Sequence, residues 1–342
     1  MEKKTIKINI SDKEKRNEEL NIDSSLEIIR KELTDKINFP FIFVDQNENE
    51  IIKENESQIK LKDILNLVLL IKKEKIKRVM KGIKLANKNK LDFYLYPQPN
   101  LTNEEKKNSI NIMLIGETGV GKSTWLHCLL NYIQNIELEE NNRYFLFDEI
   151  RLEAEYEKKY GKKPFGASLT NNPTIYNIEP TNIYKYPIRI IDTPGFGDSR
   201  GPKNDQKIFS DIKNLIESGE IKSLNTICLV LKTSETRASE LCEMMINNII
   251  SLFGKNVISN IIFIFKFSDN PNSIPVLESL KNHSPFYQIL GDVEKIPYYS
   301  FNALAYFMNN KEEYLKKIYE KNTKNFASFL KHITSLQSFS LK

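Results

Sequence analysis

The chain has 342 residues, of which 40% are hydrophobic and 28% are charged. This is the composition of an ordinary globular protein, and the length allows two domains or one large domain with an appendage. It excludes a collagen, a disulfide-stapled miniprotein and a wholly disordered chain. The 50 basic and 45 acidic residues give a net charge of +5, a mild excess that does not indicate a nucleic-acid partner.

The three cysteines are Cys128, Cys228 and Cys242, and they show no paired spacing. They therefore predict neither a disulfide framework nor a zinc site, and they fit a reducing compartment. The N-terminal segment lacks the apolar stretch of a signal peptide, and no apolar run approaches the roughly 18 residues that span a bilayer. We therefore expect a soluble cytoplasmic protein.

Residues 1–73 are expected to form a small α+β domain. Polar and apolar side chains alternate at 5–10 and 19–22, which is typical of half-buried strands. A capped helix is expected after residues 23–25. Further short strands are expected at 41–45, 51–52 and 65–71. This order resembles a ubiquitin-like β-grasp domain that would recruit an unknown protein partner, with a generic α+β domain as the alternative.

Residues 74–108 are expected to join this domain to the rest of the chain. Lysines are interleaved with apolar residues from 72 to 90, a pattern that predicts a basic amphipathic helix. A solvated connector helix is the favoured interpretation, and weak peripheral contact with a membrane is the alternative. Prolines and polar residues from 97 to 108 indicate an exposed linker.

The most informative motif follows a predicted strand at 109–115. Residues 116–123 read Gly-Glu-Thr-Gly-Val-Gly-Lys-Ser, the complete G-x-x-x-x-G-K-S pattern, and an apolar helix follows. Backbone N–H groups at the start of this helix are expected to cradle phosphates. Lys122 is expected to bridge the β- and γ-phosphates, and the Ser123 hydroxyl to bind Mg²⁺. The predicted nucleotide contacts in this loop are Gly116, Glu117, Thr118, Gly119, Val120, Gly121, Lys122, Ser123 and Thr124.

A second motif ends another predicted strand, at 188–191. It reads Asp192-Thr193-Pro194-Gly195. A carboxylate at the end of a neighbouring strand holds the metal in P-loop nucleotidases, so Asp192 is a predicted metal ligand, and the N–H of Gly195 is expected to reach the γ-phosphate. Asp-x-x-Gly in this place is typical of GTPases. Residues 109–342 are therefore expected to form a three-layer α/β/α P-loop GTPase domain.

Together the two motifs resemble those of the septin and immunity-associated (GIMAP, Toc) GTPases, the paraseptins, over residues 109–307. The resemblance implies GTP or GDP as ligand, Mg²⁺ as cofactor, GTP hydrolysis, and dimers formed across the nucleotide face. Arg237 is a candidate for that contact, with a surface ion pair as the favoured alternative. The segment 166–176 resembles switch I, in which Thr170 is the implied hydroxyl ligand of Mg²⁺ and Thr174 is the alternative.

The base-binding end departs from the pattern of this family. Lys266 and Asp269 are separated by one residue more than in the Asn/Thr-Lys-x-Asp motif, and Phe265 stands where Asn or Thr is usual. The resemblance still makes Asp269 the candidate reader of guanine, with a cap of the strand end as the alternative. Lys266 and Asn302, or Ser300, are the other candidate contacts to the base or ribose.

Phe196 stands where Ras-type GTPases place the Gln that orients the attacking water. A phenyl ring cannot orient water, so hydrolysis is expected to be slow unless Thr170, Glu117 or a second molecule takes that role. The functions left open are a GTPase switch, a nucleotide-loaded scaffold whose N-terminal domain does the work, and an ATPase. Apolar spacing from 311 to 336 predicts the last helix of the core.

Overall fold

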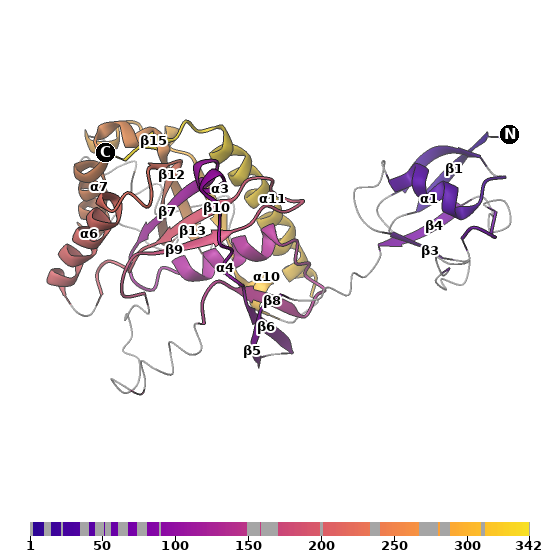
Figure 1. The fold of residues 1–342 in the computed structure, drawn as a ribbon, viewed down its shortest axis with the longest axis horizontal. Coiled ribbons are helices and arrows are strands. Elements are labelled where there is room, and N and C mark those ends of the chain that lie inside the picture. The colour runs from indigo at the N-terminus through magenta and orange to yellow at the C-terminus, as the bar shows by residue number, and fades with distance from the viewer. Residues whose placement is uncertain are drawn as a thin grey trace. The chain divides into compact units, whose positions relative to one another are not determined.

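The computed structural model describes residues 3–9, 15–21, 23–34, 41–44, 51, 56–60, 68–73, 81–88, 90–148, 158, 170–198, 201–232, 240–266, 280, 288–308 and 312–341. The chain divides into two compact units, Met1–Val79 and Met80–Lys342 (Figure 1). The boundary predicted at residue 108 therefore lies nearer to residue 80, because the segment before the phosphate loop is part of the second unit.

The first unit holds a four-stranded sheet and helix α1. Its elements are β1 (Lys3–Asn9), β2 (Lys15–Asn21), α1 (Leu26–Thr34), β3 (Phe41–Val44) and β4 (Val68–Lys73). The strand order is β2-β1-β4-β3, with β1 parallel to β4 and the other pairs antiparallel. Leu26, Ile29 and Leu33 are fully buried on one face of α1, which confirms the predicted helix. Ile51 lies outside any strand, and Ile52 is not among the described residues.

The second unit is built on a six-stranded sheet with the order β14-β13-β12-β7-β10-β9. Its strands are β7 (Ile110–Gly116), β9 (Thr174–Ile178), β10 (Ile188–Asp192), β12 (Thr226–Lys232), β13 (Ile261–Lys266) and β14 (Tyr298–Phe301). Strand β9 is antiparallel to β10, and all other neighbours are parallel. Parallel neighbours need crossover connections, which the helices of this unit supply.

Helices cover both faces of this sheet (Figure 1). One face carries α4 (Lys122–Ile133), α10 (Leu304–Phe307) and α11 (Glu313–Ser335), and the other carries α6 (Pro202–Glu217) and α7 (Glu240–Phe253). The short 3-10 helices η2 (Lys255–Asn260) and η3 (Val293–Lys295) precede β13 and β14. This three-layer α/β/α arrangement is the predicted fold of a P-loop GTPase domain, and α11 confirms the predicted last helix.

The alternation of side chains along the central strands separates two hydrophobic cores. In β12, Cys228 and Val230 belong to the core under α4 and α11, whereas Ile227, Leu229 and Leu231 belong to the core under α6 and α7. Strand β12 is covered on both faces, so it is apolar at successive positions instead of alternating with polar residues.

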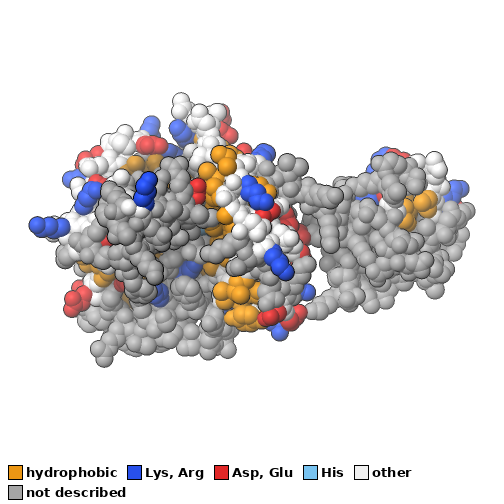
Figure 2. All heavy atoms as spheres, turned by 90° about the horizontal axis from the view of Figure 1, so that it is seen from below, with side chains coloured by type: hydrophobic (Ala, Val, Ile, Leu, Met, Phe, Trp, Pro, Cys, Tyr) orange, Lys and Arg blue, Asp and Glu red, His pale blue; other side chains and the backbone are white. Residues whose placement is uncertain are grey.

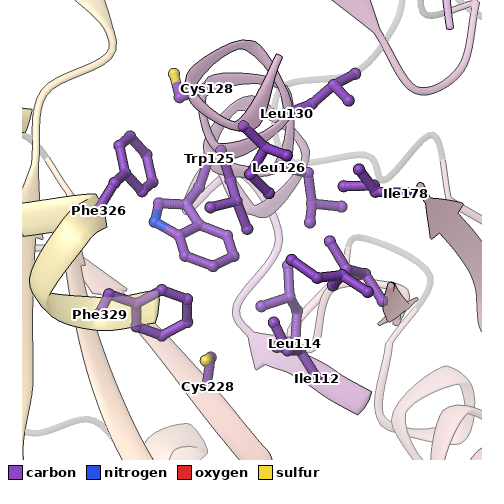
Figure 3. Close-up of a cluster of buried hydrophobic side chains, with 14 of the residues drawn as sticks. Ile112, Leu114, Trp125, Leu126, Cys128, Leu130, Ile178, Cys228, Phe326 and Phe329 are labelled. Carbon is purple, nitrogen blue, oxygen red and sulfur yellow. The ribbon is translucent and has the colours of Figure 1, made fainter. Parts of the chain in front are cut away.

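Aromatic rings close the core under α4. The indole of Trp125, in the first turn of α4, points toward Phe326 and Phe329 of α11 (Figure 3). Its centroid lies 5.4 Å from that of Phe329 at an interplanar angle of 87°, an edge-to-face arrangement that is favourable for aromatic pairs. Because all three rings are fully buried, this packing holds the start of α4 against α11.

A smaller sheet occupies part of the segment predicted to join the domains. Strands β5 (Ile83–Lys88) and β6 (Leu91–Leu95) form an antiparallel hairpin, and β6 pairs in parallel with β8 (Asn142–Phe145). The helix predicted from 72 to 90 is therefore wrong over β5, because pairing with the partly buried β6 overrides the helical spacing. Residues 74–80 lie outside the described residues.

The linker predicted from 97 to 108 is also packed onto the second unit. Leu101 is buried, and α3 (Asn103–Lys107) starts with a capping box between Thr102 and Glu105. The side-chain oxygen of Gln98 accepts a hydrogen bond of 2.9 Å from the N–H of Asn177 on β9. The segment thus covers part of the edge strand instead of spanning open solvent.

The remaining paired strands are β11 (Ser223–Leu224) and β15 (Phe339–Ser340). All three cysteines, Cys128, Cys228 and Cys242, are buried. Within the described ranges, no helix is both long and apolar enough to cross a membrane. On the face drawn in Figure 2, basic and acidic side chains of the described residues are interspersed.

Candidate functional site

The candidate site lies where the parallel strands end. Strand β7 ends at Gly116, β10 at Asp192 and β13 at Lys266. After β7 the chain adds β9 and β10 on one side of this strand and later β12 on the other, so β7 marks the switch point of the sheet. Ligands of open α/β sheets bind at this position, outside the carboxyl ends of the strands.

The phosphate loop connects β7 to α4 through left-handed backbone turns. Gly119 has a φ of 75°, and Gly121, the N-cap residue of α4, has a φ of 92°. These conformations favour glycine and turn the loop so that it leads into a helix N-terminus. A helix N-terminus offers unpaired N–H groups and partial positive charge to an anion. The local geometry therefore matches the one that the G-x-x-x-x-G-K-S motif predicts.

Lys122 is folded back onto this loop. Its Nζ donates hydrogen bonds to the carbonyl oxygens of Gly116, at 2.9 Å, and Glu117, at 3.2 Å. The side chain is buried, and burial lowers the pKa of the ammonium to about 8, whereas the charges of Asp192 and Glu117 act in the opposite direction. A buried cation is thus held at the loop in which the phosphates are expected to lie.

The second motif is joined to the phosphate loop by backbone hydrogen bonds. The N–H of Phe196 donates to the carbonyl of Gly116 at 3.2 Å, and the N–H of Thr118 donates to the carbonyl of Phe196 at 2.8 Å. A Cβ added at Gly195 would lie 2.5 Å from the Cα of Thr118, so only glycine fits this approach. The structure therefore brings the N–H-bearing backbone of Gly195 beside the loop.

The predicted metal ligands are all oxygen donors. Thr170 donates a hydrogen bond of 3.2 Å from its Oγ1 to Oδ2 of Asp192, which is fully buried. Ser123 lies in the first turn of α4, directly after Lys122. A carboxylate with hydroxyl groups is a donor set suited to Mg²⁺, which prefers oxygen ligands. Thr174 pairs with Asp192 across β9 and β10, but its hydroxyl donates to the carbonyl of Asn172 at 3.1 Å, so Thr170 is the threonine whose hydroxyl is bonded to Asp192.

At the other end of the site, Lys266 packs against the phosphate loop. Its side chain is almost fully buried, and a Cβ added at Gly121 would lie 2.9 Å from its Cε. Phe301 pairs with Lys266 across β13 and β14, which places Asn302 at the same edge of the sheet. Oδ1 of Asn302 accepts a hydrogen bond of 3.0 Å from the N–H of Leu304, so this side chain forms a turn directly before α10.

Two residues singled out by the sequence cannot be placed. Asp269, the candidate reader of guanine, lies outside the described residues, as does Arg237, the candidate dimer contact. Phe196 is described, and its ring is fully buried in the core under α6, with its centroid 4.5 Å from that of Phe209. The ring therefore points away from any place where it could contact an attacking water.

The sequence pattern did not single out Asp205, which the structure places at the second motif. Oδ1 of Asp205, in the first turn of α6, accepts a hydrogen bond of 3.0 Å from the N–H of Gly197. Burial raises the pKa of this carboxyl, and the charge of the neighbouring buried Asp198 raises it further. An acidic residue in the first turn of the helix that follows Asp-x-x-Gly is the signal that could have indicated it.

Comparison with known proteins gives distant similarities. No protein-family model matches the chain. GTP-binding protein A of Dictyostelium discoideum is 25% identical over 164 residues, which are 48% of this chain and 29% of that protein. The chain thus spans less than a third of the length of this curated relative.

Solved structures of Toc33 from Arabidopsis thaliana are also similar. The complex with GDP and Mg²⁺ has a TM-score of 0.43 and 16% identity, over 70% of this chain and 90% of that one. The dimerisation-deficient mutant has a TM-score of 0.41 and 17% identity, over 68% of this chain and 85% of that one.

Proposed function

We propose that this protein is a Mg²⁺-dependent GTPase of the septin and immunity-associated type, acting as a molecular switch. The observation that carries the proposal is the buried Lys122 folded onto the phosphate loop, with Asp192 at the end of the neighbouring strand. The partial similarity to a protein named for GTP binding supports the choice of guanine nucleotide.

In this proposal each residue of the site has a separate task. Lys122 exchanges its bonds to loop carbonyls for bonds to the β- and γ-phosphates. Mg²⁺ would be held by Ser123, Thr170 and Asp192, and it would neutralise part of the phosphate charge. Gly195 offers its N–H to the γ-phosphate, so that the second motif distinguishes a triphosphate from a diphosphate.

We assign the selection of guanine to Asp269. Lys266, three residues earlier, packs against Gly121 of the phosphate loop. A carboxylate accepts hydrogen bonds from the N1–H and amino group of guanine, and adenine lacks this donor pair. The test is competition of GTP, ATP and xanthosine triphosphate against a labelled nucleotide, in wild type and Asp269→Asn. Preference for GTP that shifts toward xanthosine triphosphate supports the assignment, and equal binding of ATP favours an ATPase.

For the N-terminal unit we propose a ubiquitin-like β-grasp domain over residues 1–73 that recruits a protein partner. Its order β2-β1-β4-β3, with two parallel central strands and α1 between β2 and β3, supports this assignment. For residues 109–342 we propose the GTPase domain, extended by the packed segment 81–108.

A nucleotide-loaded scaffold with little hydrolysis is the second candidate, and the burial of Phe196 in the core favours it. The two candidates differ in turnover. Phosphate release from GTP is measured at increasing protein concentration, with Lys122→Ala as the background. Release that rises more steeply than protein concentration supports a GTPase that dimerises across its nucleotide face. Tight GTP retention without release at any concentration supports the scaffold.

Identification of the nucleotide that co-purifies with the full chain is the most direct single experiment. We expect GDP or GTP after acid extraction and chromatography. Recovery of adenine nucleotide would overturn the guanine assignment. Binding of labelled GTP by refolded Lys122→Ala as tight as that of wild type would overturn the site itself.

A further inference from the structure

The backbone of the turn after Asp-x-x-Gly is hydrogen-bonded on two sides. On one side, the backbone of Phe196 is bonded to Gly116 and Thr118 of the phosphate loop. On the other side, the N–H of the next residue, Gly197, donates to the carboxylate of Asp205 on α6. The turn therefore forms a physical link between the phosphate loop and the first turn of α6.

Gly197 cannot be anchored by a side chain of its own. Its φ is 66°, and a Cβ at this position would contact the side chain of Leu241 on α7. The position of Gly197 therefore depends on hydrogen bonds of its backbone, and the carboxylate of Asp205 accepts the hydrogen bond from its N–H.

An ionised carboxylate at Asp205 is costly in this position. Asp205 is 7% exposed and Asp198 is 4% exposed, so two neighbouring carboxyl groups are both withdrawn from water. Burial and like charge both disfavour the ionised state. The hydrogen bond from Gly197 offsets part of this cost, and it is stronger to a carboxylate than to a neutral acceptor.

We infer that Asp205 is a positioning residue for nucleotide sensing: through Gly197 it holds the N–H of Gly195 where the γ-phosphate is bound, and it couples this turn to α6. The inference rests on the proposed binding of GTP. In the proposed binding mode the N–H of Gly195 reaches the γ-phosphate and no other phosphate, so loss of the Asp205 acceptor weakens binding of a triphosphate more than binding of a diphosphate.

The test compares the affinities for GMPPNP and GDP, both with Mg²⁺, by calorimetry on the full chain. Asp205→Ala removes the acceptor, and Asp205→Asn keeps an acceptor oxygen without the charge. We expect Asp205→Ala to lower the ratio of GMPPNP to GDP affinity by about tenfold, the effect of one hydrogen bond to a charged group. Asp205→Asn restores most of the ratio. Asp211→Ala, on the same helix, is the matched control and leaves the ratio unchanged.

An unchanged ratio in folded Asp205→Ala overturns the inference while leaving GTP binding intact. Failure of wild type to bind GMPPNP removes the proposed function and the inference together. If Asp205→Ala does not fold, amide hydrogen exchange of Gly197 in wild type decides the question. Stronger protection with GMPPNP than with GDP supports the coupling, and equal protection overturns it.

Discussion

The ammonium of Lys122 lies 2.9 Å from the carbonyl oxygen of Gly116, so the residue that opens α4 is bonded to the residue that ends β7. The two residues are the ends of the phosphate loop, and the hydrogen bond closes the loop on itself. A ligand phosphate and the loop carbonyls would therefore compete for the same cation, which makes Lys122 the residue through which binding and local stability are linked.

Substitution of this lysine is the sharpest test of the site. We expect Lys122→Ala to weaken binding of GMPPNP and GDP by about 100-fold or more, since two bonds from a charged donor are lost. Calorimetry measures the affinities, and circular dichroism checks that the variant is folded. Lys107→Ala removes an exposed lysine of α3 and should bind like wild type. Near-wild-type affinity in folded Lys122→Ala would show that the phosphates bind elsewhere.

The close approach of Gly195 to Thr118 predicts a selective defect. We expect Gly195→Ala to lower affinity for GMPPNP at least tenfold more than affinity for GDP, because the added methyl group displaces the N–H that faces the γ-phosphate. Gly219→Ala is the control, since no described atom lies within 4 Å of its added Cβ, although its φ of 73° adds a backbone strain that Gly195 does not have. Equal loss for both nucleotides would count against a role at the γ-phosphate.

The contact between Thr170 and Asp192 predicts a metal-dependent effect. Thr170→Val keeps the shape of the side chain and removes the hydroxyl, so we expect about tenfold weaker GMPPNP binding in Mg²⁺ and little change in EDTA. Thr174→Val tests the alternative threonine and should have no such effect. A Mg²⁺-dependent loss in Thr174→Val alone would reverse the assignment.

The burial of Phe196 predicts that a glutamine here does not restore fast hydrolysis. We expect Phe196→Gln to release phosphate no faster than wild type, because its side chain would enter the core beside Phe209. It should also lower the free energy of unfolding by about 3 kcal/mol through loss of apolar contact and burial of an amide. Phe196→Leu, which stays apolar, should cost about 1 kcal/mol. Faster hydrolysis by a stable Phe196→Gln would contradict the orientation of this ring.

The raised pKa of Asp205 predicts a pH dependence of stability. Because its folded-state pKa lies above the unfolded value, the native state binds the proton more tightly, and this contribution to stability is lost as pH rises through the folded-state pKa. Asp205→Asn removes the titration and the repulsion with Asp198. We expect the stability of Asp205→Asn relative to wild type to increase in urea unfolding as the pH rises above about 4, the ordinary pKa of Asp. A constant difference would mean that Asp205 is not perturbed.

Much of the GTPase-fold unit could be predicted because its signals are local. The apolar strand, glycine-rich loop and amphipathic helix around Lys122 follow one another in the chain, and Asp192 directly ends its own strand. The helix predicted from 72 to 90 failed for the opposite reason. The spacing of lysines along β5 suits a helix locally. The segment is a strand because it pairs with β6, and β6 in turn pairs with β8, which comes from a distant part of the chain.

The sequence by itself determined the phosphate loop, the second motif and the strands that carry them, since periodicity and glycine placement act between near neighbours. The tertiary structure decided which distant groups meet at the site. It placed Thr170 beside Asp192, the side chain of Lys266 against Gly121, and Asp205 on the N–H of Gly197. These contacts depend on how strands and helices pack at the end of the sheet, and no spacing within a single segment specifies them.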